Sequence, residues 1–134
     1  MNEIQKQNEL TITTFMDGIS EPKGYILFGI IPDKECKKTH FFRLENMQFH
    51  SSWDWLMSVV EKIETMGFQV DTLSRLLPLS MTEKDHNCFI WNDEHTYKVC
   101  ETSSIESKLK ATYEAIIEFI NWYNKRNIRK RNKI

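Results

Sequence analysis

The chain has 134 residues and a mass of 16.0 kDa, and its 18 Lys and Arg against 19 Asp and Glu give a formal net charge of −1. The presence of only four glycines and three prolines excludes collagen-like and low-complexity proteins. The longest apolar stretch, residues 25–31, is far shorter than the roughly 20 residues that a membrane helix needs. Because the first residues lack an apolar segment that would serve as a signal peptide, we expect a soluble cytoplasmic protein with no membrane partner.

The near-neutral total hides an uneven distribution of charge. Residues 125–134 contain six basic side chains and no acidic one, whereas the rest of the chain has 12 basic and 19 acidic residues, a net charge of −7. We therefore expect a single acidic domain over residues 1–124 and a basic C-terminal tail over residues 125–134.

The first fifty residues have the least regular pattern. The apolar side chains of residues 8–17 have helical spacing, whereas the three threonines of the same segment favour a strand, so the residues alone leave both alternatives open. Residues 25–31 form an apolar run that we interpret as a buried strand, with residues 39–44 as its partner across a charged turn.

A helix is predicted after residue 52. Either Ser51 or Ser52 can cap it, and Ser51 with Asp54 has the spacing of a capping box. Apolar side chains then recur with a helical period at Trp53, Leu56, Val60 and Ile63. Gly67 is expected to end the helix, because glycine accepts the left-handed conformation that follows a last turn.

Three strands are predicted beyond this helix. Residues 68–73 alternate apolar with polar side chains, which is typical of a half-buried strand. Residues 88–91 and 96–100 are rich in aromatic and β-branched side chains, and the polar run 92–95 lies between them. This pattern predicts a hairpin with a short loop.

A second clear helix is predicted from Ser103, which has capping-box spacing with Glu106. The end of this helix is apolar nearly all round, so it needs cover on more than one side. Either the sheet and loops of the same domain or a second subunit supplies that cover. The candidate residues for self-association are Ile117, Phe119 and Trp122.

Two segments carry a resemblance to a known group of proteins. Residues 49–64 resemble the central helix of small uncharacterised proteins from phages and integrated elements of gut Bacteroidetes, and residues 107–124 resemble their C-terminal helix. Those proteins are related to the phage ABA sandwich domain, in which helices pack on a small antiparallel sheet. The resemblance implies a helix at residues 8–17, because Phe15-Met16-Asp17-Gly18 is similar to the motif that ends the N-terminal helix of the family.

We therefore expect an α+β fold in which two to three amphipathic helices pack with a small, mainly antiparallel sheet, as in an α-β-α sandwich. The chain departs from the resemblance in its strand-like insert at residues 24–44, in Ser58 where the family often has proline, and in its basic tail. The family has no established activity, so the resemblance implies an association with phages or mobile elements and no particular reaction.

Candidate residues for catalysis or metal binding are sparse. His50 stands beside two serines, but helix capping explains both of them and no Gly-x-Ser-x-Gly motif is present. Cys36-x-x-x-His40 and His86-x-Cys88 are only fragments of a zinc site, and the scattered glycines form no phosphate-binding loop. We expect no catalytic site, no cofactor and no metal.

The basic tail has two interpretations. Its cations can neutralise nucleic-acid phosphates, or they can lie in solvent beside an acidic body. The second interpretation is favoured, because motifs that read bases are missing and the acidic body repels phosphate. The possible nucleic-acid contacts are Lys125, Arg126, Arg129, Lys130, Arg131 and Lys133.

We therefore expect a non-enzymatic accessory protein that works as an interaction module. Its partner is either another protein or a second copy of the chain. The alternative is a weak, sequence-independent nucleic-acid binder that uses the basic tail.

Overall fold

The computed structural model contains three helices and two antiparallel three-stranded sheets within the residues that it describes. Those residues are 2–16, 19–20, 25–28, 40–43, 48–76, 84–92, 94 and 96–131. The chain divides into two compact units, Met1–Lys62 and Ile63–Ile134, and each is described by itself. The expectation of one domain over residues 1–124 stays a prediction.

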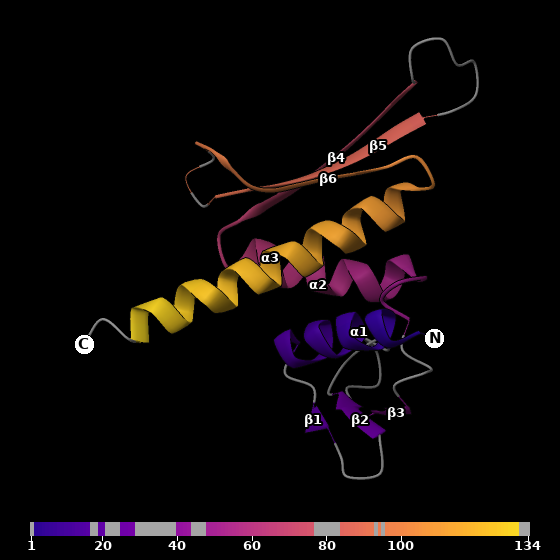
Figure 1. The fold of residues 1–134 in the computed structure, drawn as a ribbon, viewed down its shortest axis with the longest axis vertical. Coiled ribbons are helices and arrows are strands. Elements are labelled where there is room, and N and C mark those ends of the chain that lie inside the picture. The colour runs from indigo at the N-terminus through magenta and orange to yellow at the C-terminus, as the bar shows by residue number, and fades with distance from the viewer. Residues whose placement is uncertain are drawn as a thin grey trace. The chain divides into compact units, whose positions relative to one another are not determined.

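Helix α1 (Glu3–Phe15) opens the first unit (Figure 1). The Asn2 side chain caps it, because Asn2 Oδ1 accepts a hydrogen bond of 2.7 Å from the backbone N–H of Gln5. Thr11 and Thr13 donate their hydroxyl groups to carbonyls four residues earlier, so both fit within a helix. The helix implied by the resemblance is therefore confirmed over residues 8–15.

Three short strands follow α1 in the first unit: β1 (Ile19–Ser20), β2 (Tyr25–Phe28) and β3 (His40–Arg43). They form an antiparallel sheet in the order β1-β2-β3. Strand β2 pairs with β3 in a continuous register from Tyr25↔Arg43 to Phe28↔His40. The predicted pairing of the apolar run with residues 39–44 is thus confirmed for the described parts of both segments.

Helix α2 (Trp53–Thr65) begins after Ser52, whose Oγ accepts from the backbone N–H of Trp55 at 3.5 Å. Of the two serines that the sequence offered as caps, Ser52 therefore fills the role. The predicted apolar stripe is wrong at one position, because Trp53 is 40% exposed and Trp55, which the stripe left out, is 3% exposed. The Trp55 and Phe49 rings pack in a T-shaped arrangement, with the ring centroids 5.0 Å apart. Gly67, with a φ of 102°, ends the helix as predicted.

The second unit is built on an antiparallel sheet of β4 (Gln69–Leu76), β5 (Lys84–Trp91) and β6 (Lys98–Ser104), in that order. The predicted hairpin is confirmed as β5 and β6. The Asn92 side chain closes it, because its Oδ1 accepts from the backbone N–H groups of Thr96 at 2.7 Å and Tyr97 at 3.1 Å.

Helix α3 (Lys108–Arg131) follows the sheet. The predicted start at Ser103 is wrong, because Ser103 and Ser104 continue strand β6 and pair with β5. Ser107 is the cap instead, and its Oγ accepts from the backbone N–H of Lys110 at 3.0 Å. Ile105 is 65% exposed in the connection before the helix.

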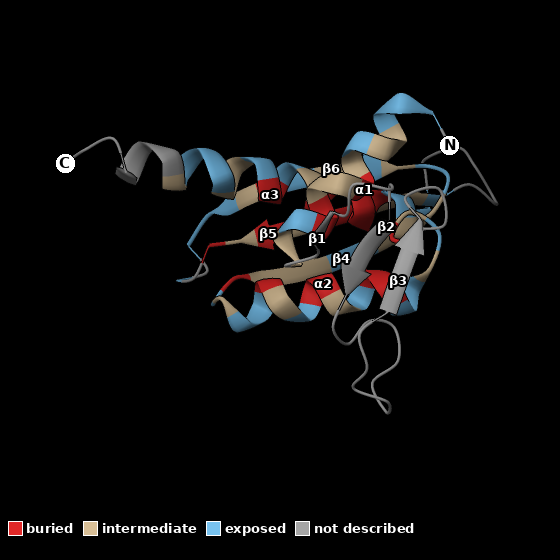
Figure 2. Ribbon diagram, turned by 90° about the horizontal axis from the view of Figure 1, so that it is seen from below, coloured by how far each residue is buried: buried red, intermediate tan, exposed pale blue. Residues whose placement is uncertain are grey.

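Helix α3 lies along one face of this sheet, mainly over β5 and β6 (Figure 1). Thr102 Oγ1 donates to the carbonyl of Ala111 at 2.5 Å, and the Phe68 ring packs edge-on against Phe119 with the centroids 4.9 Å apart. Figure 2 shows buried positions of α3 and β5 in red. Ile90 of β5 and Ile116 of α3 are completely buried. The α+β class and the antiparallel sheet packed against helices are confirmed. Among the described residues, no helix is both long and apolar enough to cross a membrane.

Candidate functional site

The sheet of the second unit has one face that α3 does not cover. Because side chains alternate between the two faces of a strand, the register assigns each residue of β4, β5 and β6 to one face. Thr102 bonds to α3, and Cys88, which pairs with Thr102, hydrogen-bonds Thr112 of α3. Residues one position away therefore point to the opposite side. We call this side the outer face; it comprises Gln69, Asp71, Leu73 and Arg75 of β4, Asp85, Asn87, Phe89 and Trp91 of β5, and Lys98, Glu101 and Ser103 of β6.

Two aromatic side chains occupy the middle strand of the outer face. Phe89 and Trp91 are both half-buried, and the Lys98 ammonium lies over them, 4.4 Å from the Phe89 ring centroid and 5.7 Å from that of Trp91. Glu101 forms an ion pair with Lys98 at 3.8 Å. Aromatic residues are enriched at the centres of protein interfaces and polar groups at their rims, so this arrangement makes the outer face the candidate site of the second unit.

The β4 side of the outer face exposes apolar and charged groups together. Leu73 is 46% exposed and Arg75 is exposed, while Asp71 is half-buried and accepts from the Gln69 amide at 2.9 Å. Leu76, at the end of the same strand, is 56% exposed. Strand β4 is an edge of the sheet, since its described hydrogen-bonded neighbour is β5 alone.

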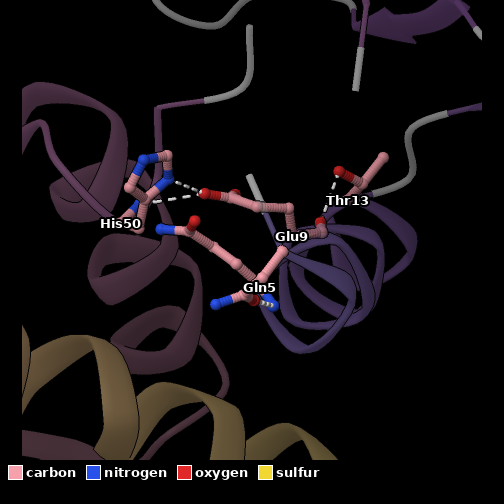
Figure 3. A network of polar contacts seen from close by, with 5 residues as sticks. Gln5, Glu9, Thr13 and His50 are labelled. Atoms are coloured by element: carbon pink, nitrogen blue, oxygen red, sulfur yellow. Dashed lines mark hydrogen bonds and ion pairs between the residues drawn. The ribbon is translucent and has the colours of Figure 1, made fainter. Parts of the chain in front are cut away.

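The first unit contains a buried carboxylate–imidazole pair, shown in Figure 3. Glu9 lies in the middle of α1 and is completely buried. Its Oε1 accepts from the backbone N–H of His50 at 3.1 Å and from the Nδ1 of the same residue. The Thr13 hydroxyl donates to the backbone carbonyl of Glu9 at 2.7 Å. These contacts hold α1 against the turn that precedes α2.

Burial sets the ionisation of Glu9. Removal from water raises the pKa of the carboxyl above its ordinary value, and the hydrogen bonds from His50 oppose this rise only in part. Glu9 Oε2 has no hydrogen-bond partner among the residues that the structure describes. A carboxylate that orients a histidine is one part of a catalytic triad, but Ser52 of the adjacent pair is used as a helix cap.

The described cysteines have the properties of core residues. Burial raises the pKa of Cys88 to about 11 and that of Cys100 to about 12, so both are neutral thiols at physiological pH. His86, two residues before Cys88, shares a hydrogen bond of 2.7 Å with the Ser74 hydroxyl. No cluster of three or more His, Cys, Asp or Glu that could hold a metal occurs among the described residues. Cys36 and the side chain of His40 lie outside them.

The predicted basic tail is not separate from the last helix in its described part. Helix α3 continues without a break through residue 124 to Arg131, so five of the six predicted cations lie on it. Lys125 and Arg126 are exposed, and the Arg126 guanidinium lies 5.4 Å from the Trp122 ring centroid. Lys133 lies outside the described residues.

The three residues predicted for self-association differ in their exposure. Ile117 and Trp122 are half-buried, whereas Phe119 is completely buried and contacts Phe68. Trp122 also contacts Phe68, with the ring centroids 5.9 Å apart. Phe68, which directly precedes β4, thus covers part of the apolar end of α3.

Neither the outer face nor the Glu9–His50 pair is evident from local sequence patterns. The aromatic and β-branched side chains of residues 88–91 indicate a strand, but the identity of its covered face depends on α3, which begins 17 residues later. Glu9 and His50 are 41 residues apart, and a lone glutamate in a helical pattern looks like a solvent-facing residue.

Comparisons with known proteins give no family for this chain. No protein-family model matches it. No curated protein and no solved structure matches it significantly either.

Proposed function

We propose that the chain is a non-enzymatic interaction module that binds a protein partner through the outer face of the β4-β5-β6 sheet. The observation that carries this proposal is the aromatic pair Phe89 and Trp91 on the middle strand of a face that α3 leaves uncovered. Half-buried aromatic side chains supply large apolar area and lose little conformational entropy on binding, which makes them frequent binding hot spots.

The charges of the outer face favour a protein partner over a nucleic acid. Arg75 and Lys98 are its cations, whereas Asp71, Asp85 and Glu101 are its carboxylates. Lys98 is already paired with Glu101 at 3.8 Å. Phosphates would meet an excess of negative charge, whereas a mixed rim is common at protein interfaces.

The association with a phage or mobile element is part of the same proposal. It is supported by the resemblance of residues 49–64 and 107–124 to helices of phage-related proteins. The partner is therefore to be sought among the products of genes that neighbour this one. The genomic neighbourhood separates a phage operon from a metabolic one before any protein is made.

The direct test uses purified products of the neighbouring genes and measures their binding to the full chain by biolayer interferometry. Trp91→Thr keeps a strand-forming residue but removes the aromatic ring, and we expect it to weaken binding by about tenfold or more. Ile105→Thr is the matched control, because Ile105 is an exposed apolar residue outside the outer face. Equal losses from both variants, or binding unchanged by Trp91→Thr, would exclude the outer face as the binding surface.

The second candidate function is weak nucleic-acid binding through the basic end of α3. The continuous helix through Arg131, with Lys125 and Arg126 exposed, is the observation that favours it. If these residues bind phosphates, the slope of log affinity against log salt falls by about 1 for each cation removed. Fluorescence anisotropy with a single-stranded oligonucleotide compares the full chain with Lys125→Gln/Arg126→Gln and with residues 1–124. Binding that none of these changes weakens would exclude this function.

A further inference from the structure

We infer that the free edge of β4 pairs with β4 of a second copy of this chain, in an antiparallel register centred on Leu73, so that two three-stranded sheets join into one of six strands. The juxtaposition that carries the inference is the order of side chains along β4, which is complementary to itself in that register.

Strand β4 has the features of an edge that can accept another strand. It pairs with β5 over eight residues without a register shift, and it contains neither proline nor glycine. Among the described residues no other strand pairs with its second edge. Every second backbone N–H and C=O of an edge strand points away from the sheet, and those of β4 form a template for a further strand.

The apolar groups of this edge are exposed, although apolar groups in a small domain are usually covered. Leu73 on the outer face is 46% exposed, and Leu76 on the α3 side is 56% exposed, because α3 lies mainly over β5 and β6. Thr72 and Arg75 are exposed as well. A neighbouring strand would cover side chains on both faces of β4.

The register centred on Leu73 makes every cross-strand pair favourable. On the outer face it places Leu73 against the partner's Leu73, and Asp71 against the partner's Arg75. On the other face it places Val70 against the partner's Leu76, and Thr72 against the partner's Ser74. Opposite charges, apolar pairs and hydroxyl pairs are the cross-strand contacts that stabilise antiparallel sheets. A two-fold axis repeats each contact, as an isologous dimer requires.

The alternative registers are poorer. The two-fold axis of the dimer must pass through a residue of β4 and not between two residues. Only then do opposing side chains of the two copies lie on the same face of the joined sheet. Centring on residue 71 sets Asp71 against the partner's Asp71, and centring on residue 72 sets Asp71 against the partner's Leu73. Centring on residue 74 sets Leu73 against the partner's Arg75. Only the Leu73 centre pairs the aspartate with the arginine.

The opposite edge of the same sheet is protected. The pairing of β6 with β5 has a register shift next to Ile90 and Trp91, and such irregularities disfavour the addition of a strand. Charged residues also lie on β6, and an axis through Glu101 would bring two carboxylates together. Charged side chains that meet no opposite charge on an added strand are a common protection of edge strands. The inference therefore applies to β4 and not to β6.

In the part of the chain that the structure describes, the charged groups beside the new pair are Asp71, Arg75 and Asp85. Arg75 lies between the partner's Asp71 and its own cross-strand neighbour Asp85, so it gains a second carboxylate on pairing. Asp71 has the uncharged Phe89 as its neighbour on β5 and the Gln69 amide as its hydrogen-bond donor. The dimer consequently gains two Asp–Arg pairs, and the described residues of β4 bring no like charges opposite one another.

Sedimentation velocity of the full chain over a range of concentrations tests the inference. We expect the mean mass to rise with concentration from 16.0 kDa toward twice that value. Asp71→Arg and Arg75→Asp each place like charges opposite one another and weaken dimerisation by about tenfold. The double variant Asp71→Arg/Arg75→Asp is made together with Asp85→Asn, because Asp85 faces position 75 on β5. It restores opposite charges across the axis and recovers the dimer, which excludes misfolding as the cause of the single effects. Glu101→Arg on β6 is the matched charge reversal and leaves the dimer unchanged.

Cysteine cross-linking tests the register. On mild oxidation Leu73→Cys forms an intermolecular disulfide, whereas Asp71→Cys does not, because residue 71 lies about 13 Å along the strand from the partner's residue 71. The parent chain controls for its native cysteines.

Three results would overturn the inference: a monomer at all concentrations, a dimer that the charge reversals leave intact, or a dimer that only Trp122→Ala dissociates. The last result would place self-association on α3. None of them bears on partner binding through Trp91, which is measured with a different ligand, so the inference and the proposed function fail separately.

Discussion

Glu9 is a carboxyl group enclosed in the first unit, where it accepts hydrogen bonds from His50 and holds α1 to the turn before α2. Cys88 and Cys100 are enclosed in the second unit in a similar way. In each case removal from water disfavours the charged form of the side chain. The pKa values of all three groups are raised, and their chemistry is that of structural residues.

The raised pKa of Glu9 predicts a pH dependence of stability. Between the ordinary value of 4.5 and the higher value of the folded protein, the folded state holds a proton that the unfolded state has lost. The wild type therefore loses stability relative to Glu9→Gln as the pH rises through this window. Urea denaturation from pH 4.5 to pH 7 measures the difference, with Glu3→Gln in the same helix as the control for loss of one charge. If the free energy of unfolding of the wild type, relative to that of Glu9→Gln, stayed constant or rose with pH, the burial of Glu9 would be contradicted.

The raised pKa values of Cys88 and Cys100 predict that neither thiol reacts in the folded protein. At pH 8 both are protonated and enclosed, so at most one of the three cysteines reacts with a thiol reagent such as DTNB. All three react after unfolding in urea. Two or three reactive thiols under native conditions would contradict the placement of this pair.

The residue-scale features follow from the sequence only in part. The pattern around Cys88 predicts a strand. In the structure Cys88 pairs with Thr102 of β6, which lies beyond the predicted second strand of the hairpin, residues 96–100. Glu9 has no local signal, because its partner is 41 residues away. Contacts between distant segments depend on packing, which no short window of sequence contains.

At the scale of elements, helices and strands are predictable from periodicity, and their ends are the parts that tertiary structure changes. Helix α2 matches its predicted position closely. The predicted hairpin forms, but β5 begins at Lys84 and β6 ends at Ser104, so both strands extend past the predicted residues 88–91 and 96–100. The start of α3 does not, because Ser103-x-x-Glu106 has capping-box spacing while Ser103 pairs with Asn87 in the sheet. Pairing with β5 extends β6 through the predicted cap and leaves Ser107 to begin the helix.

The true cap of α3 is testable by paired substitutions. Ser107→Ala removes the acceptor of the Lys110 N–H and lowers the free energy of unfolding by about 1 kcal/mol. Ser103→Ala changes an exposed strand position and alters stability by less than about 0.5 kcal/mol. Urea denaturation of both variants decides between the two starts. A larger loss of unfolding free energy from Ser103→Ala than from Ser107→Ala would indicate that Ser103 is the cap.

At the scale of the whole molecule, the second unit has one face enclosed by α3, and the two surfaces at which we propose association lie elsewhere on the same sheet. One face of the sheet packs against α3, the outer face carries Phe89 and Trp91, and the β4 edge carries a self-complementary order of side chains. The α+β class, with its amphipathic helices, is evident from the sequence. The two surfaces are not, because they depend on which face α3 covers and on which strand lies at the edge.

If two copies of this chain pair through their β4 edges, hydrogen–deuterium exchange at rising protein concentration detects the pairing at the amides that form it. Every second amide of β4 points away from β5 and exchanges readily in a monomer. We expect the outward-pointing amides of β4 to become protected as the concentration rises, while those of the β6 edge keep the same exchange rate. Exchange of β4 that does not change with concentration, or protection that develops at β6 instead, would contradict it.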